Sequence, residues 1–400
     1  MTEQNLSEPR TTALYERHVA LGASFTDFGG WSMPVRYSSD LAEHHAVRTT
    51  AGLFDISHMA EFLVTGRDAG VFLDYALAGA ISPMRIGKAK YSLVLAESGG
   101  IVDDVIVYRI AEDRFLVIAN AGNRDAVADA FAERTRRAPV AAAFVETPPE
   151  GEGTQVFSNI EGVSGGATVE DITDEVSLIA VQGPAAQAIL EATHVSDVQP
   201  SLAELGYYAW SSASFEGEQV LVARTGYTGE DGLELLVANR AAPALWDALL
   251  AAGEPHGLVP AGLAARDTLR LEAGMPLYGH ELSLDTVPAQ AGMGRVVAVD
   301  KSDFVGKAGL AADASADAPV LVGLVSEGKR AGRAGYAVLH GDDRVGEITS
   351  GALSPTLGHP IAMAFVSPAV SEPGTELDID VRGTRIRATV TALPFYRRAQ

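Results

Sequence analysis

Cysteine is absent from this chain of 400 residues, and lysine occurs only at positions 88, 90, 301, 307 and 329. Without cysteine there can be no disulfide, zinc–thiolate site, iron–sulfur cluster or thiol nucleophile. The 30 basic residues face 52 acidic ones, so the formal net charge is −22. Nucleic acids and anionic membranes are bound by basic surfaces. We therefore expect neither kind of partner.

Long apolar runs are also missing. None reaches the roughly 18–20 residues that cross a bilayer, and the first residues lack the apolar core of a secretory signal. We therefore expect a cytoplasmic protein. No metal motif is present: no second histidine follows His280-Glu281 at the required spacing. The adjacent His44 and His45 would point about 100° apart on a helix, so we expect no metal site.

What the chain does contain is a globular composition, with 47% apolar and 20% charged residues. Helical spacing and caps predict helices over 38–51, 66–79, 121–137, 184–193, 240–253 and 261–273. Runs of β-branched and aromatic residues predict strands over 60–65, 91–96, 101–109, 114–119, 176–182, 219–224 and 233–238. Because strands and helices do not alternate strictly, an α+β fold is expected rather than a doubly wound parallel sheet.

The pattern changes after about residue 315. The small, acidic stretch 312–319 is typical of a linker. Beyond it, strands are predicted over 320–326, 335–340, 344–350, 361–367, 376–382 and 385–393, with no good helix among them. This part of the chain is expected to form a small all-β barrel or sandwich. The Gly-rich stretch 147–166 is expected to be a surface loop.

Two adjacent acids lie inside an apolar strand that follows Gly99 and Gly100. Neighbouring strand residues face opposite ways, so Asp103 and Asp104 lie on different faces. At least one carboxylate must then enter apolar surroundings, which costs several kcal/mol unless it is paired or hydrogen-bonded. The pattern leaves two readings open. One is a structural acid bonded to amides of the glycine turn, and the other is a functional acid.

A second polar group lies at residues 224–232, where three glycines, Arg224, Tyr227 and two acids separate two predicted strands. Glu234 falls inside the second of those strands. Closely spaced glycines permit a close approach of backbone to another group. The density of polar residues favours a ligand-binding loop over a simple hairpin.

Two further residues are ambiguous when taken singly. Arg266 lies on the predicted helix 261–273 and can bind an anion with two parallel hydrogen bonds. For Arg266 taken alone, an ordinary helix salt bridge with Asp267 or Glu272 is the favoured reading. His58 stands alone in its segment, and a lone histidine is more often a satisfied core or surface residue than a catalyst.

Together these segments resemble the T-protein of the glycine cleavage system, the tetrahydrofolate-dependent aminomethyltransferase family. The resemblance runs from Thr12 to Arg398 in the order of the family. It is carried by FGGWSMPVRY (28–37), GLFDISHM (52–59), GGIVDDVIV (99–107), IANAGN (118–123), LIAVQGP (178–184), RTGYTGEDGLEL (224–235), AGLAARDTLRLEAGMPLYGHEL (261–282), DFVGK (303–307) and GEITSGALSP (346–355).

The resemblance implies a multi-domain fold with mixed and antiparallel sheets and helices around a central folate channel. Residues 10–285 would form the folate-binding catalytic region from two intertwined α+β subdomains. Residues 286–317 would be a connecting segment, and residues 318–397 a C-terminal barrel. The implied reaction transfers a one-carbon unit from the S-aminomethyl-dihydrolipoyl arm of the H-protein to tetrahydrofolate. It releases ammonia and forms 5,10-methylenetetrahydrofolate.

The resemblance also implies roles for individual residues. The essential acid of the family matches Asp104. Residues expected to bind folate are Glu234, Arg266, Tyr396, Asn120, Tyr91, Tyr227 and Arg224. The expected partners are therefore lipoylated H-protein and folate, with tetrahydrofolate as one-carbon acceptor and no metal.

The chain departs from the family in three places. Stretch 147–166 is longer than expected, Gln290 stands where the family usually has glutamate, and Arg295 replaces a frequent aromatic. The iron–sulfur-assembly relatives carry a motif with cysteine, which this chain lacks. Two other functions stay open, namely a folate-dependent demethylase of the same fold and a folate-binding module without catalysis.

Overall fold

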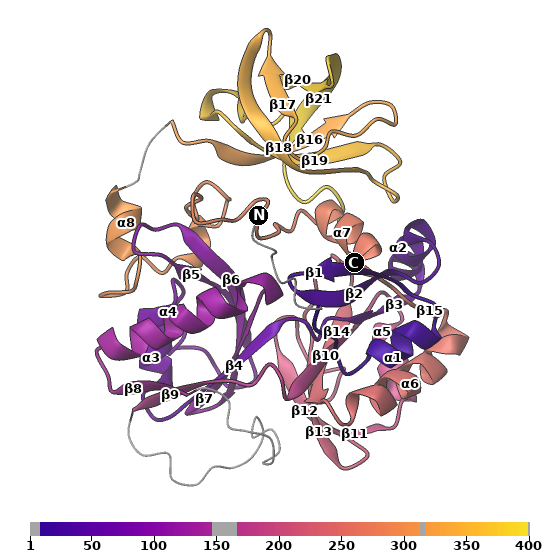
Figure 1. Ribbon diagram of the computed structural model, residues 1–400, viewed down its shortest axis with the longest axis vertical. Helices are drawn as coiled ribbons and strands as arrows, with labels where there is room; N and C mark the ends of the chain where they lie inside the picture. Colours follow the sequence, from indigo (N-terminus) through magenta and orange to yellow (C-terminus); the bar gives the residue numbers. More distant parts are fainter. Residues whose placement is uncertain (1–8, 146–165, 313–316, 399–400) are drawn as a thin grey trace, which may run out of the picture.

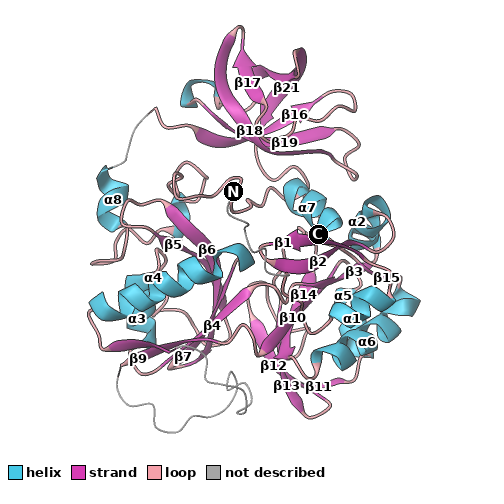
Figure 2. Cartoon of the chain, viewed as in Figure 1, coloured by secondary structure: helices cyan, strands magenta, loops and turns pink. Residues whose placement is uncertain are grey.

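The computed structural model describes residues 9–145, 166–312 and 317–398. Two large sheets lie side by side, and a closed barrel covers one end of both (Figure 1). Helices lie mainly on the outer sides of the two sheets (Figure 2). The predicted α+β class is therefore confirmed.

The first sheet is built from strands between residues 60 and 171. Its strands are β4 (Ala60–Thr65), β5 (Ala89–Leu95), β6 (Ile101–Ala111), β7 (Arg114–Ala119), β8 (Ala142–Val145) and β9 (Ala167–Asp171). Their order is β5–β6–β7–β4–β9–β8. Helices α3 (Ala69–Ala76) and α4 (Arg124–Arg137), the latter preceded by the 3₁₀ turn η1 (Ala121–Asn123), pack on one face through buried Phe72, Phe131 and Phe62.

The second sheet has seven strands. They are β3 (Ala51–Asp55), β10 (Val176–Gln182), β11 (Val195–Gln199), β12 (Trp210–Phe215), β13 (Glu218–Ala223), β14 (Gly232–Ala238) and β15 (Leu258–Pro260). Their order is β11–β12–β13–β14–β10–β3–β15, antiparallel except for the pair β3 and β15. Helices α5 (Ala186–Ala192) and α6 (Ala242–Gly253) cover its outer face, where Trp246 is fully buried.

The inner faces of the two sheets meet in a shared core. Leu63 and Ile118 of the first sheet pack in the same apolar cluster as Leu178 and Leu236 of the second. Strands β10 and β14 are buried along their whole length because each has apolar neighbours on both faces. The region between the sheets is thus the natural place for a buried site.

Smaller elements close the edges of this core. They are α1 (Tyr15–Ala20), the hairpin β1 (Ser24–Phe28) and β2 (Trp31–Arg36), α2 (Asp40–Thr49), the turn η2 (Glu254–His256), α7 (Leu263–Glu272), η3 (Gly294–Val296) and α8 (Lys307–Ala312). The Ser39 hydroxyl caps α2 by accepting from the amide of Ala42, as the serine pair before this helix predicts. At Gly100 a Cβ would lie 1.8 Å from the carbonyl oxygen of Leu284, so only glycine allows this close approach.

The C-terminal part forms the predicted barrel. Its strands are β16 (Val320–Ser326), β17 (Ala337–His340), β18 (Asp343–Leu353), β19 (Pro360–Val366), β20 (Glu376–Val381) and β21 (Thr384–Thr391), with the turn η4 (Pro368–Val370). They close in the order β16–β19–β18–β17–β20–β21 around Leu324, Val338, Ile348 and Val366. Within the described residues no helix is long and apolar enough to cross a membrane.

Most predicted elements are observed, with differences at their ends. Strands β4, β7, β10 and β16 have the predicted bounds. Several elements were not predicted, namely α1, β1, β2, β3, β8, β9, β11, β12, β15 and α8. The predicted surface loop at 147–166 lies, except for Gly166, outside the described residues.

Candidate functional site

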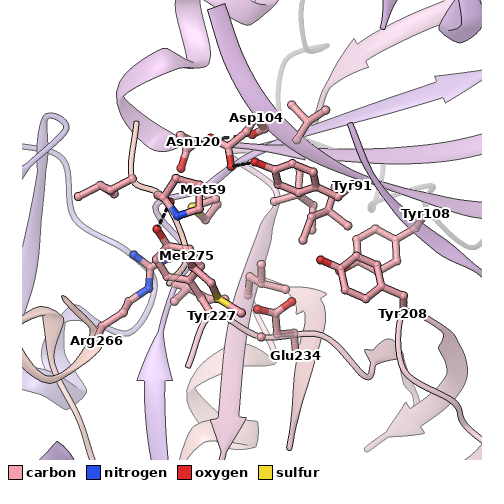
Figure 3. Close-up of a pocket in the computed structure, with 18 of the residues that line it drawn as sticks. Met59, Tyr91, Asp104, Tyr108, Asn120, Tyr208, Tyr227, Glu234, Arg266 and Met275 are labelled. Carbon is pink, nitrogen blue, oxygen red and sulfur yellow. Dashed lines mark hydrogen bonds between the residues drawn. The ribbon is translucent and has the colours of Figure 1, made fainter. Parts of the chain in front are cut away.

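A cavity of about 340 Å³ lies between the two sheets. Its wall is mainly apolar and aromatic, with a few converging polar groups, as in sites for organic ligands. Figure 3 shows Asp104 and Tyr91 on one side and Glu234 and Arg266 across the opening. The cavity also contacts Ile56, Met59, Val105, Ile106, Tyr108, Ile118, Asn120, Leu178, Tyr208, Gly226, Tyr227, Met275, Pro276, Leu277 and Met293.

Strand alternation in β6 directs Asp104 into this cavity. Ile106 and Tyr108 lie on the same face of the strand and also line the cavity. Asp103 faces the other way and is fully buried. The two acids therefore have different surroundings although they are neighbours in sequence.

Residues after β7 provide most of the hydrogen bonds to the acid pair. The Asn120 side-chain amide donates to Asp104 at 2.8 Å and to Asp103 at 2.8 Å. Asp103 also accepts from the Asn120 backbone at 2.8 Å and from the Asn123 amide at 2.7 Å. The Tyr91 hydroxyl donates to Asp104 at 2.9 Å. The hydrogen bonds to the acid pair thus come from Asn120, Asn123 and Tyr91, whereas the structural interpretation expected the amides of the glycine turn. Asp104 still faces the cavity.

Burial raises the pKa of both acids. It brings the pKa of Asp103 to about 7, with the nearby Asp104 charge as a second cause. Burial likewise raises the pKa of Asp104 above its ordinary value, although hydrogen bonds from Tyr91 and Asn120 oppose this. A carboxylate with a raised pKa can exchange a proton near neutral pH.

Glu234 comes from the second sheet. It lies in β14 opposite Ala180 of β10 and Ala223 of β13. The Thr225 hydroxyl donates to its carboxylate, and that hydroxyl lies 3.1 Å from the hydroxyl of Tyr108 of the first sheet. Burial raises the pKa of Glu234. The two sheets are thus joined by hydrogen bonds at the cavity.

The glycine loop at 224–232 packs tightly on Gln182. A Cβ at Gly226 would lie 2.0 Å from the side-chain oxygen of Gln182, and one at Gly232 would lie 2.2 Å from its nitrogen. These glycines let the loop close over β10 and bring Tyr227 to the cavity, where its hydroxyl donates to the carbonyl of Pro276.

Arg266 reaches the cavity from α7. Its guanidinium lies 4.7 Å from the ring centre of Tyr227, and no ion pair to it is found among the described residues. The salt-bridge alternative applies instead to Arg270, which pairs with Asp267 and with buried Glu281. Arg266 also lines a neighbouring cavity of about 390 Å³. A half-buried guanidinium without an ion pair among the described residues, next to two cavities, is suited to an anionic ligand group.

Two predicted folate-binding residues lie outside the central cavity. Arg224 donates to Asp231 at 2.7 Å, to Gln187 at 2.9 Å and to a backbone carbonyl. Tyr396 stacks under the guanidinium of Arg48 at 4.1 Å. The structure therefore brings together six of the eight predicted residues, namely Asp104, Glu234, Arg266, Asn120, Tyr91 and Tyr227.

Several cavity residues were not singled out from the sequence. They include Met59, Tyr208, Met275 and Met293. Met59 and Met275 lie in the segments 52–59 and 261–282, which resemble the family, so the sequence held a signal for these two residues. Tyr208 and Met293 lie in no such segment. In the described part of the chain, no three His, Asp or Glu side chains are grouped as metal ligands.

Two family models match this chain. The family model described as the GCVT N-terminal domain matches residues 14–301, and the glycine cleavage T-protein C-terminal barrel domain matches residues 320–397. The aminomethyltransferase of Cutibacterium acnes is 51% identical over 98% of this chain and 99% of its own length. That of Saccharopolyspora erythraea is 50% identical over 98% of this chain and its own full length.

A solved structure leads to the same assignment. The crystal structure of the glycine cleavage system aminomethyltransferase T from Bartonella henselae has a TM-score of 0.81 and 34% sequence identity. It covers 97% of this chain and 98% of the other. The resemblance seen in the sequence motifs is confirmed. The chain therefore belongs to the glycine cleavage T-protein family and is an aminomethyltransferase.

Proposed function

We propose that this enzyme moves the aminomethyl carbon from a dihydrolipoyl arm of the H-protein to tetrahydrofolate. The carbon–sulfur and carbon–nitrogen bonds of the aminomethyl group break, and two bonds from the carbon to folate nitrogens form. One folate proton ends on the sulfur and the other on the departing ammonia. The observation that carries the proposal is Asp104, hydrogen-bonded and exposed to a cavity that also contains Glu234 and Arg266.

The cavity wall fits tetrahydrofolate. The pterin carries a donor-rich amino-pyrimidine edge, which matches the carboxylate of Glu234 as acceptor. Tyr208, Tyr227 and Tyr108 offer aromatic surface for a flat ring system. The negative end of folate fits the unpaired guanidinium of Arg266. Folate, when bound, supplies the nucleophilic nitrogens.

Asp104 is proposed to orient a folate nitrogen and to take up the proton that the nitrogen loses on attack. Tyr91 and Asn120 fix the carboxylate by one hydrogen bond to each oxygen. A fixed base contributes through both orientation and proton transfer. The apolar remainder of the wall excludes water from the reacting carbon.

The experiment that tests this function is folate-dependent ammonia release from aminomethylated H-protein. Methylenetetrahydrofolate is the expected product. A methyltetrahydrofolate product from an N-methyl or S-methyl compound would identify a demethylase instead. Tight folate binding without turnover would identify a binding module. Each of the three outcomes identifies one of the three functions that the sequence left open and excludes the other two.

The rate is expected to fall as the pH is lowered through the raised pKa values of the acid pair. A base acts only when ionised, and burial raises the pKa of Asp103 to about 7 and that of Asp104 above 3.8. Because the two acids interact, the acid limb belongs to the pair. The measurement is kcat against pH. A rate that stays constant down to pH 3.8 would contradict the assignment.

Replacing Glu234 by glutamine is expected to weaken folate binding by about tenfold to a hundredfold, the value of a hydrogen bond to a charged acceptor. The amide would also point a donor at the donor edge of the pterin. Folate titration followed by tyrosine and tryptophan fluorescence measures the effect. The control is Glu376→Gln on barrel strand β20, where the exposed side chain lies 3.5 Å from Arg387. Equal affinities for the Glu234 variant and wild type would refute the role of this carboxylate.

A further inference from the structure

A small chamber adjoins the central cavity. It has a volume of about 130 Å³, and Met59, Asn120, Arg266 and Leu277 line both spaces. The rest of its wall comes from Phe28 and Gly29 of the β1–β2 hairpin, His58, the η1 turn and Tyr278. Gly29 and Gly122 in its wall are exposed, so the chamber lies between the central cavity and exposed residues.

His58 is an unsatisfied polar group in this wall. The side chain is 1% exposed, and neither ring nitrogen has a hydrogen-bond partner among the residues that the structure describes. The ring packs edge-to-face on Phe28 at 5.4 Å. A buried polar group without a partner costs free energy, so such a group calls for an explanation. A polar molecule in the chamber would provide the missing partner.

Apart from the Arg266 guanidinium and the Tyr278 hydroxyl, the other polar side chains of the chamber present acceptors. Asn120 and Asn123 both direct their amide nitrogens to Asp103. Each side chain therefore keeps its carbonyl oxygen free to accept, and no hydrogen bond to either oxygen is found among the described residues. Burial, with the charge of Arg266 as a second cause, lowers the pKa of His58 to about 3, so its ring is neutral and offers an acceptor nitrogen.

Size and charge restrict the occupant. At about 30 Å³ per water molecule, the chamber holds roughly four such molecules. It is too small for a pterin or a lipoyl arm, which fit the larger cavity. Arg266 disfavours a cation there. A small, neutral molecule rich in donors matches both the volume and the acceptors.

We propose that this chamber receives the ammonia released by the reaction and that His58 holds it by a hydrogen bond on its way to solvent. The inference rests on the proposed function, because ammonia is a product only of that reaction. Ammonia has three N–H donors for the imidazole and the two amide oxygens. His58 is thus a positioning residue for the leaving nitrogen. Asp104 takes up the proton that the folate nitrogen loses.

The reverse reaction tests the proposal, because ammonia is then a substrate. Methylenetetrahydrofolate and reduced H-protein are held constant and ammonium is varied. His58→Phe keeps the ring and removes both nitrogens. Its KM for ammonium is expected to rise about threefold to tenfold, the loss of one hydrogen bond. Its KM for the folate is expected to stay within about twofold of wild type. His58→Gln restores an acceptor and should recover part of the loss.

Glu234→Gln provides the matched comparison. It should raise the KM for the folate and leave the KM for ammonium unchanged, which is the opposite pattern. His58→Phe should unfold at the same denaturant concentration as wild type or a higher one, since the imidazole makes no hydrogen bond that the phenyl ring would lose. This separates a positioning role from a structural one.

A second measurement uses the wild-type enzyme. With ¹⁵N-labelled histidine, ammonium should move the ring signals of one of the nine histidines, the one missing from the His58→Gln spectrum. An unmoved signal would overturn the proposal. So would an unchanged KM for ammonium in His58→Phe, or equal rises in both KM values. A wild-type enzyme without folate-dependent turnover would instead overturn the proposed function together with this site.

Discussion

Asp104→Asn is expected to lower kcat by about 10²–10⁴-fold, the usual contribution of a positioned general base. Asparagine has the same shape, so the Tyr91 hydroxyl can still donate to its oxygen. The amide cannot take up a proton, and its nitrogen faces the Asn120 amide, which now donates toward a donor. Single-turnover formation of methylenetetrahydrofolate measures the effect. Folate affinity should change little, since Asp104 acts mainly as the reaction proceeds.

Asp103→Asn is the matched control for this experiment. Asp103 accepts three hydrogen bonds from Asn120 and Asn123 and faces away from the cavity. Replacing Asp103 should lower the free energy of unfolding, and its effect on kcat per folded molecule should be the smaller one. If Asp104→Asn turned over within about threefold of wild type, the general-base role would be refuted.

Glu272→Ala is expected to destabilise the fold by about 3–5 kcal/mol, the cost of removing one partner from a buried ion pair. Glu272 is fully buried and lies 2.7 Å from Arg48 of α2. It also accepts from the Ser354 hydroxyl and the Thr356 amide of the loop after β18. Denaturant unfolding measures the loss. Hydrogen exchange should rise at the Thr356 amide, which loses its acceptor.

The same carboxylate gives an acid-sensitive contribution to stability. Burial alone would raise the pKa of Glu272, but hydrogen bonds from His44, Ser354 and Arg48 lower it from 4.5 to about 2. Because the folded pKa is depressed, the stabilisation is complete above pH 4.5 and is lost as the pH falls toward 2. The difference corresponds to about 3 kcal/mol.

Glu347→Ala on β18 is the control for both measurements. Its pair with Arg344 is exposed, so its loss should cost about 0.5 kcal/mol or less and leave the acid sensitivity unchanged. A Glu272→Ala protein as stable as wild type, or as acid-sensitive, would contradict the proposed role of the network.

The elements that the sequence predicted correctly are those with a strong local pattern. Strands β4, β7 and β10 are mostly apolar segments between turns, and their predicted bounds are those observed. Strand β12 has the sequence WSSASF and β15 has three residues. Their neighbours in the sheet make them strands, and a local pattern cannot show such neighbours.

For the site residues, too, local patterns in the sequence were informative and contacts made by the fold were not. The cost of burying a charge in a strand drew attention to the pair Asp103 and Asp104 and to Glu234. The resemblance to the family selected Asp104, and the fold places Asp104 and Glu234 on the wall of one cavity. Arg224 belongs to the polar loop that favoured a ligand site, yet its guanidinium donates to Asp231 and Gln187. Whether the His58 ring has a hydrogen-bond partner depends on which polar groups the fold places beside it, so no sequence pattern could reveal it.

Helix α7 gives the barrel an influence on a cavity that it does not line. Arg266 points from this helix into the cavity, whereas Arg270 donates to Ser350 of the barrel and Glu272 holds the loop after β18. One rigid element therefore carries both contacts. By thermodynamic reciprocity, a ligand that fixes Arg266 also tightens the attachment of the barrel, and a barrel that loosens its hold weakens the ligand. We therefore expect substitutions that loosen the contacts between the barrel and α7 to weaken ligand binding at Arg266.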